Sequence, residues 1–113
     1  MRIFQMVMIF GVFMLAIACN APSQTEKVDY KTAFLVDVRT PEEFAEGSAA
    51  GAVNIPLQEI GQRLEEFKGK NQIVVFCRSG NRSSQAKSIL EQNGFKNIIN
   101  GGTWEQVRDS QNN

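Results

Sequence analysis

Histidine is absent from this 113-residue chain, and cysteine occurs only twice. Without histidine, the chain has no Ser-His or Cys-His catalytic pair and no imidazole ligand for a metal. Two cysteines are also too few for a four-thiolate zinc site. Any nucleophile must therefore be activated by something other than imidazole, and we expect neither a metal nor an organic cofactor.

An excess of positive charge is missing as well, because 12 lysine and arginine residues balance 12 aspartate and glutamate residues. Nucleic-acid binding requires basic side chains that displace the counterions of the phosphate backbone. We therefore expect no nucleic-acid partner. The length suits one small globular domain, which we expect to be a monomer.

Long apolar runs are confined to the N-terminus. Residues 3–18 are apolar except for Gln5 and Gly11, and Arg2 precedes them. This run is shorter than the about 20 residues that a membrane-spanning helix needs. A basic start, a short apolar core and small residues are typical of a secretory signal, so we expect residues 1–18 to be a signal peptide.

The sequence Ala16-Ile17-Ala18-Cys19 at the end of this run resembles the lipobox of bacterial lipoproteins, although leucine is usual at the position of Ala16. The resemblance implies lipidation of Cys19 and export to the bacterial cell envelope. Acyl chains would then attach the protein to a membrane, facing the periplasm or the exterior. The alternative is a plain signal peptide or an uncleaved signal anchor, with Cys19 incidental.

Composition also divides the rest of the chain. Residues 19–32 are mostly polar and contain Pro22, which predicts a flexible tether that begins with the lipidated cysteine. We expect the folded domain over residues 33–110 and a short tail over residues 111–113. The sequence shows no internal repeat and no second domain.

Short runs rich in β-branched and aromatic residues predict strands over residues 33–38 and 72–76. Their continuous apolar character is typical of strands that are buried on both faces of a parallel sheet. Shorter strands are expected over residues 53–55 and 97–99.

Helical patterns lie between these strands. Thr40-Pro41-Glu42-Glu43 has the pattern of a capping box, with Glu43 as a capping residue, and predicts a short helix that ends near Gly47. Further helices are expected over residues 57–67, from residue 82 or 83 to residue 94, and from residue 103 onward. The alternation predicts an α/β fold, a small and mostly parallel sheet with helices on both faces.

Cys77 follows directly on the predicted strand over residues 72–76. In parallel α/β sheets, functional residues lie beyond the carboxyl ends of the strands. If residues 77–82 wrap around the Cys77 sulfur, their backbone N–H groups form an anion-binding nest at a helix N-terminus. Gly80 and Asn81 are residue types that tolerate the left-handed backbone of such a loop.

Arg78 and Arg82 stand in the same loop. Cations are unfavourable beside the positive end of a helix dipole, so two of them there indicate a bound anion. Helix N-termini and neighbouring arginines also lower the pKa of a cysteine. These features predict that Cys77 is largely thiolate at neutral pH.

Four segments together resemble the single-domain rhodaneses, which are thiosulfate sulfurtransferase-like proteins. The segments are DVRTPEEF over residues 37–44, GAVNIP over residues 51–56, CRSGNRS over residues 77–83, and Gly101-Gly102 with Trp104. The resemblance runs from about Phe34 to Trp104 and implies a rhodanese-like fold.

The resemblance also implies an activity. Cys77 would attack the outer sulfur of a small sulfur-containing anion such as thiosulfate, become a persulfide, and pass that sulfur to cyanide, a small thiol or a protein thiol. The arginines would attract the donor, and the residues between them would contribute mainly backbone N–H groups. The residues that this assigns to substrate binding are Arg78, Ser79, Gly80, Asn81 and Arg82.

The chain departs from the family pattern at Ser48-Ala49, where family members commonly carry His-Ile. This changes a side chain that shapes the rim of the site and leaves the nucleophile in place. We interpret Asp37 and Arg39 as structural, with Asp37 accepting backbone N–H groups and Arg39 pairing with a neighbouring carboxylate. Trp104 is interpreted as a core or lid aromatic.

Two other functions remain open. Cys-dependent phosphatases and arsenate reductases also hold a cysteine in an anion-binding loop, but the tyrosine-phosphatase pattern places five residues between Cys and Arg. Only four separate Cys77 from Arg82, and position 83 is serine. The other alternative is a non-catalytic or redox sulfur-carrier or binding module of the cell envelope, because low-pKa thiolates also exchange with disulfides.

Overall fold

The computed structural model describes residues 27–113. The predicted signal peptide, the lipidation of Cys19 and most of the predicted tether lie outside the described residues. Within residues 27–113, no helix has both the length and the apolar character needed to cross a membrane.

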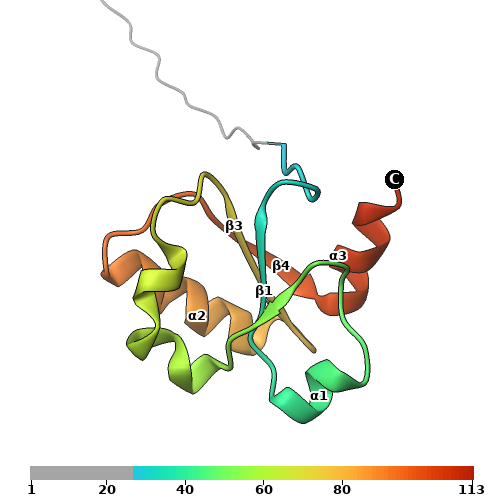
Figure 1. The fold of residues 1–113 in the computed structure, drawn as a ribbon, viewed down its shortest axis with the longest axis horizontal. Helices are drawn as coiled ribbons and strands as arrows, with labels where there is room; N and C mark the ends of the chain where they lie inside the picture. Colours follow the sequence, from blue (N-terminus) through green and yellow to red (C-terminus); the bar gives the residue numbers. More distant parts are fainter. Residues whose placement is uncertain (1–26) are drawn as a thin grey trace, which may run out of the picture.

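A four-stranded parallel sheet forms the centre of the fold (Figure 1). The strands are β1 (Phe34–Asp37), β2 (Val53–Asn54), β3 (Ile73–Cys77) and β4 (Ile98–Thr103). Their order across the sheet is β2-β1-β3-β4. This confirms the α/β fold with a parallel sheet that the alternating pattern predicts.

Helices cover both faces of this sheet. The α-helices are α1 (Pro41–Ala45), α2 (Asn81–Gln92) and α3 (Trp104–Gln111), and the 3-10 helices are η1 (Leu57–Gln62) and η2 (Leu64–Phe67). Figure 1 shows α2 and the two 3-10 helices on one side of the sheet and α3 on the other. The predicted arrangement of helices on both faces is therefore confirmed.

Alternation along β3 assigns its side chains to two cores. All five residues of β3 are buried. Ile73, Val75 and Cys77 belong to the core cluster on the α2 side, whereas Val74 and Phe76 belong to the cluster on the α3 side. Since successive side chains of a strand point to opposite faces, this register directs the Cys77 side chain toward the start of α2.

The capping box predicted at the start of α1 is confirmed. The Glu43 backbone N–H donates to Thr40 Oγ1 at 3.1 Å, and Glu43 Oε1 accepts the Thr40 backbone N–H at 2.9 Å. These two bonds satisfy backbone donors that a helix N-terminus otherwise leaves free. They also fix the Glu43 side chain at the carboxyl end of the sheet.

The segment over residues 57–67 differs from the single helix that its apolar spacing predicts. It forms η1 and η2, which are separated at Arg63, where φ is −124°. The apolar pairs Leu57/Ile60 and Leu64/Phe67 are each three residues apart, which matches the three residues per turn of a 3-10 helix. The four-residue step from Ile60 to Leu64 spans the break.

Strand β4 is longer than the predicted segment over residues 97–99. It continues through Thr103, and its pairing with β3 shifts between Val75 and Phe76, so that Gly101 is the extra residue of a bulge. A Cβ at Gly101 would lie 2.7 Å from Val107 Cγ2 and 2.9 Å from Val74 Cγ1. Glycine therefore allows the bulge to pack closely against α3.

Part of the predicted tether packs against the domain. Val28 and Tyr30 lie against the core cluster on the α3 side, and the Asp29 backbone N–H donates to Gln72 Oε1 at 3.1 Å. Partial burial of Tyr30 gives this polar segment an apolar contact that its composition does not reveal. At the other end, α3 extends to Gln111.

Candidate functional site

The loop after β3 turns its backbone toward the Cys77 sulfur. The N–H groups of Gly80 and Ser83 donate to Sγ at 3.0 and 3.4 Å. Gly80 has the left-handed conformation that the sequence predicts, with φ of 95°. Asn81 is instead the first residue of α2, and its N–H donates to Ser79 Oγ at 3.5 Å.

This environment lowers the pKa of the Cys77 thiol below its usual value. Burial opposes ionisation and raises the pKa. Hydrogen bonds from the Ser83 hydroxyl and from the backbone N–H groups of Ser83, Ser79 and Gly80 have the opposite effect and outweigh burial. The predicted nest of backbone N–H groups therefore contributes to the lowered pKa of Cys77, together with the Ser83 hydroxyl, which the sequence did not predict.

A polar network links the Cys77 sulfur through the buried Ser83 side chain to Asn100, which is exposed. The Ser83 side chain is fully buried, and its Oγ lies 3.4 Å from Cys77 Sγ and donates to Asn100 Oδ1 at 2.7 Å. Asn100 is fixed by two further bonds, from its Nδ2 to the Gly80 carbonyl at 3.2 Å and from the Gly102 N–H to its Oδ1 at 2.9 Å. Because a hydroxyl carries one proton, the sulfur and Asn100 compete for it.

Ser83 and Asn100 are site residues that the sequence did not predict. Ser83 is the last residue of the CRSGNRS segment, and this position beside the loop could have indicated that it belongs to the site. Asn100 has no such signal, because the parallel pairing of β3 with β4 and the bulge beside Val75 bring it to the loop.

Arg82 is paired with a carboxylate of the chain itself. Its Nη1 and Nη2 donate to Glu43 Oε1 and Oε2 at 2.9 and 3.1 Å, and Arg78 Nε lies 3.4 Å from Glu43 Oε2. The Arg82 hydrogen bond is the largest of the effects that lower the pKa of Glu43 to about 2. The anion that faces both arginines in this structure is therefore Glu43, which the sequence analysis interpreted as a capping residue.

The two arginines differ in exposure. The Arg78 side chain is 61% exposed, whereas that of Arg82 is 32% exposed and that of Glu43 21% exposed. The hydrogen bond to Glu43 is the largest cause of the raised pKa of Arg82, and the negative charge of Cys77 adds a smaller effect, as expected for a guanidinium close to the sulfur. Arg82 is thus part of the electrostatic surroundings of Cys77, and Arg78 extends toward solvent.

A second ion pair lies at the same edge of the sheet and is buried. Arg39 Nη2 lies 2.7 Å from Asp37 Oδ2 and donates to the Gly47 carbonyl at 2.6 Å. The Arg39 guanidinium also lies 5.0 Å from the centre of the Trp104 ring. These contacts confirm the structural interpretation of Asp37 and Arg39. Trp104 is half-buried and packs against the core cluster on the α3 side.

Ser48 belongs to this buried network. Its hydroxyl donates to Asp37 Oδ2 at 2.7 Å, and the adjacent Ala49 is buried in the core on the α3 side. The two residues that replace the usual His-Ile therefore help to satisfy a buried carboxylate and to fill the core.

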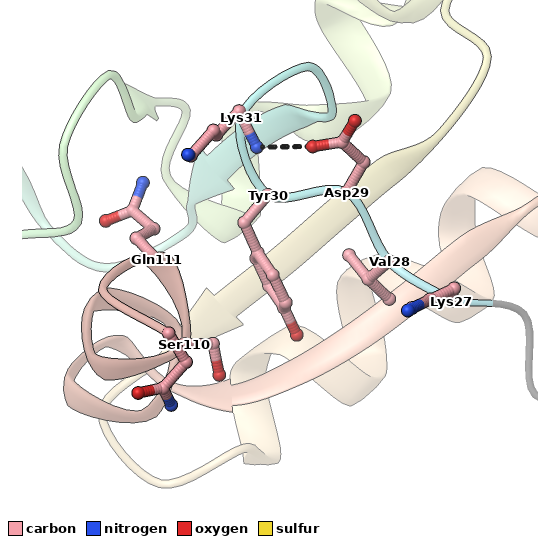
Figure 2. Close-up of a pocket in the computed structure, with 8 residues that line it drawn as sticks. Lys27, Val28, Asp29, Tyr30, Lys31, Ser110 and Gln111 are labelled. Atoms are coloured by element: carbon pink, nitrogen blue, oxygen red, sulfur yellow. Dashed lines mark hydrogen bonds between the residues drawn. The ribbon is translucent and has the colours of Figure 1, made fainter.

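A separate groove lies at the opposite edge of the sheet (Figure 2). It has a volume of about 370 Å³ and is lined by residues 27–31 before β1 and by Ser110, Gln111 and Asn113 at the end of α3. Within residues 27–113, no cluster of three or more His, Cys, Asp or Glu side chains is arranged to hold a metal ion. The hydrogen-bond donors that surround a nucleophilic side chain are therefore found around Cys77 and not in this groove.

A family model described as the rhodanese-like domain matches residues 20–106. The chain belongs to the rhodanese-like domain family. Relatives that match this chain include proteins named as sulfurtransferases, which agrees with the resemblance in the sequence.

Three comparisons describe how similar these proteins are. Thiosulfate sulfurtransferase PspE of Escherichia coli is 41% identical over 74 residues, covering 64% of this chain and 71% of the relative. A sulfurtransferase of Allochromatium vinosum is 39% identical over 72 residues, covering 64% of this chain and 67% of the relative. The solved structure of a rhodanese with anions from E. coli has a TM-score of 0.61 and 33% identity, covering 66% of this chain and 89% of the other.

Proposed function

We propose that this rhodanese-like domain is a sulfurtransferase that carries sulfane sulfur on Cys77, from a thiosulfate- or persulfide-type donor to a nucleophilic acceptor. The observation that carries the proposal is the pair of N–H donors, from Gly80 and Ser83, that face Sγ at 3.0 and 3.4 Å. Such donors stabilise an anionic sulfur without a histidine base.

In the first half-reaction, the Cys77 thiolate attacks the outer sulfur of thiosulfate. A new S–S bond forms to Cys77, the bond between the two donor sulfurs breaks, and its electron pair leaves with sulfite. The total charge is conserved, because the thiolate and thiosulfate give an anionic persulfide and a sulfite dianion. The backbone donors of the loop hold a negatively charged sulfur before and after this step.

In the second half-reaction, a nucleophilic acceptor attacks the outer sulfur of the persulfide. With cyanide, a C–S bond forms, the S–S bond breaks, and thiocyanate leaves while the Cys77 thiolate is regenerated. A small thiol or a protein thiol would accept the sulfur in the same way, as its own persulfide. Because the Cys77 side chain has no exposed surface in this structure, both half-reactions require the loop to open transiently.

The direct test is an intact-mass measurement of the full chain, solubilised in mild detergent, after exposure to thiosulfate. We expect a mass gain of one sulfur atom that is absent in Cys77→Ser and is removed by cyanide with release of thiocyanate. No gain would contradict sulfur transfer. A gain without transfer to cyanide or thiols would instead support the sulfur-carrier alternative, and turnover of an aryl phosphate that depends on Cys77 would support a phosphatase.

We also propose that the protein is exported and anchored to a membrane through lipidated Cys19, with the domain facing the periplasm or the exterior. The support is the sequence of residues 1–19, with a basic start, an apolar core and Ala-Ile-Ala-Cys at its end. In a bacterial host, metabolic labelling with a fatty-acid analogue should label the full chain. Cys19→Ser should abolish the label, and an equally labelled Cys19→Ser protein would contradict lipidation.

A further inference from the structure

The positive charge beside Cys77 is partly offset within the protein. Arg78 and Arg82 carry two positive charges, and both face the Glu43 carboxylate, at 3.4 Å from Arg78 Nε and at 2.9 and 3.1 Å from the two terminal nitrogens of Arg82. These three groups have a net charge of plus one. Together with the Cys77 thiolate, the local charge is zero, so the site has little excess positive charge to offer an incoming anion.

Glu43 is held at this place by contacts that do not involve the arginines. Its Oε1 accepts the Thr40 N–H at 2.9 Å and lies 3.2 Å from Thr40 Oγ1, as part of the capping box of α1. A donor anion that pairs with Arg82 would therefore not release Glu43 into solvent. The negative charge of Glu43 therefore remains close to Arg82 and to the donor during the reaction.

The carboxylate is ionised at neutral pH, since the Arg82 hydrogen bond above all lowers the pKa of Glu43 to about 2. Its side chain is only 21% exposed, so water and salt screen it less than they screen a surface carboxylate. Its repulsion of anions is thus present throughout the neutral range.

We propose that Glu43 is a specificity-determining residue that selects sulfur donors by charge, favouring singly charged or neutral sulfane-sulfur donors over the thiosulfate dianion. The proposal rests on the sulfurtransferase function proposed above. An alkanethiosulfonate transfers its terminal sulfur by the same chemistry as thiosulfate, since Cys77 gains an S–S bond and a sulfinate leaves in place of sulfite. The two donors differ by one unit of charge, so their ratio isolates the electrostatic effect.

The first experiment does not depend on sulfur transfer. Cys77 of the full chain is alkylated with iodoacetate, an anion, and with neutral iodoacetamide, and the ratio of the two second-order rate constants is measured at low salt. Glu43→Gln should raise this ratio about two- to three-fold, the size expected for one unit charge at roughly 8 Å in a solvent-like dielectric. A change in the pKa of Cys77 affects both reagents equally and cancels in the ratio.

The matched control is Glu42→Gln, which removes the same charge from the exposed neighbouring position of α1. In Glu42→Gln, the ratio of the iodoacetate and iodoacetamide rate constants should remain close to that of the wild type. Glu43→Gln preserves the capping box, because the new side-chain oxygen still accepts the Thr40 N–H, so the thermal midpoint should change little. Glu43→Asp keeps the charge, and its ratio should also stay near that of the wild type.

The second experiment compares loading of Cys77 by thiosulfate and by methanethiosulfonate. We expect wild type to prefer methanethiosulfonate, and Glu43→Gln to shift the ratio toward thiosulfate by about two- to three-fold. High salt should reduce the difference between the variants.

The outcomes separate the two proposals. An unchanged iodoacetate ratio in Glu43→Gln, or an equal change in Glu42→Gln or Glu43→Asp, would overturn the role of Glu43. The other informative outcome is that the ratio of the iodoacetate and iodoacetamide rate constants shifts as expected but neither donor loads Cys77. The sulfurtransferase proposal would then fail, and the proposed preference for singly charged or neutral sulfur donors would fail with it. The effect of the Glu43 charge on anions would still stand.

Discussion

Two arginine–carboxylate pairs lie at the carboxyl end of the sheet, and they differ mainly in burial. The buried pair, Asp37–Arg39, has an N···O distance of 2.7 Å and side chains that are 0% and 3% exposed. The loop pair, Glu43–Arg82, has a similar distance of 2.9 Å, but its side chains are 21% and 32% exposed. The same ionic chemistry is thus present in two environments.

The surroundings of the pairs explain their different roles. Asp37 also accepts the Ser48 hydroxyl and the Arg39 backbone N–H, and Arg39 contacts Gly47 and Trp104. The contacts of the buried pair named here are all with other residues of the domain. The loop pair lies close to the Cys77 sulfur and is partly open to solvent, so it can act on a substrate. Burial therefore distinguishes a pair that holds the structure from one that is available for function.

The largest effect should come from neutralising the buried pair. Asp37→Asn leaves the Arg39 guanidinium buried without a counterion, which destabilises a protein by about 3–5 kcal/mol. The matched variant Glu43→Gln should lower the free energy of unfolding by less than about 1 kcal/mol, because the loop pair is partly solvated. Urea denaturation of both variants measures the difference. Equal losses of stability would contradict the distinction between the pairs.

The next effect concerns the function of the loop pair. Arg82→Ala removes a positive charge and leaves Glu43 uncompensated beside Cys77, so the loading of Cys77 by thiosulfate should slow by about ten-fold. The double variant Arg82→Ala/Glu43→Gln should recover part of this loss. Stopped-flow or quenched-flow mass spectrometry gives the rates. An unchanged rate in Arg82→Ala would remove Arg82 from the substrate site.

A smaller effect is expected at the sulfur itself. Ser83→Ala removes a hydroxyl hydrogen bond that lowers the pKa of Cys77, so this pKa should rise slightly. The effect is small because Asn100 competes for the hydroxyl proton at 2.7 Å. The pH dependence of iodoacetamide alkylation measures the pKa. Ser84→Ala, on the exposed side of α2, is the control and should leave the pKa unchanged.

The smallest effect is the pH dependence that the loop pair gives to stability. The pKa of Glu43 is lowered to about 2 from its ordinary value of 4.5, mainly by the Arg82 hydrogen bond. The folded state therefore binds this proton more weakly than the unfolded state, and the resulting stability is fully present above about pH 5 and is lost as the pH falls toward 2. The stability difference between wild type and Glu43→Gln should shrink over this window in urea denaturation. A constant difference would contradict the assignment.

Local sequence patterns were sufficient for much of the fold. The continuous apolar run of β3 predicted a buried parallel strand, and the Thr40–Glu43 pattern predicted a capped helix, because both features depend on residues close together in the chain. The apolar spacing of residues 57–67 predicted a single helix, which is wrong, because the segment forms two 3-10 helices. A 3-10 helix and an α-helix share much of their apolar periodicity, so the spacing alone does not distinguish them.

The sequence by itself determined the sheet, the loop between β3 and α2 and the position of Cys77 at the end of a buried strand, since hydrophobic periodicity and the residue types of the loop encode them locally. Only the tertiary structure decided which groups surround the sulfur. Glu43 reaches Arg82 across 39 residues of sequence, and Asn100 reaches Ser83 across 17. The parallel order β2-β1-β3-β4 gathers these side chains at one edge, and no local pattern records contacts that depend on strand order and register.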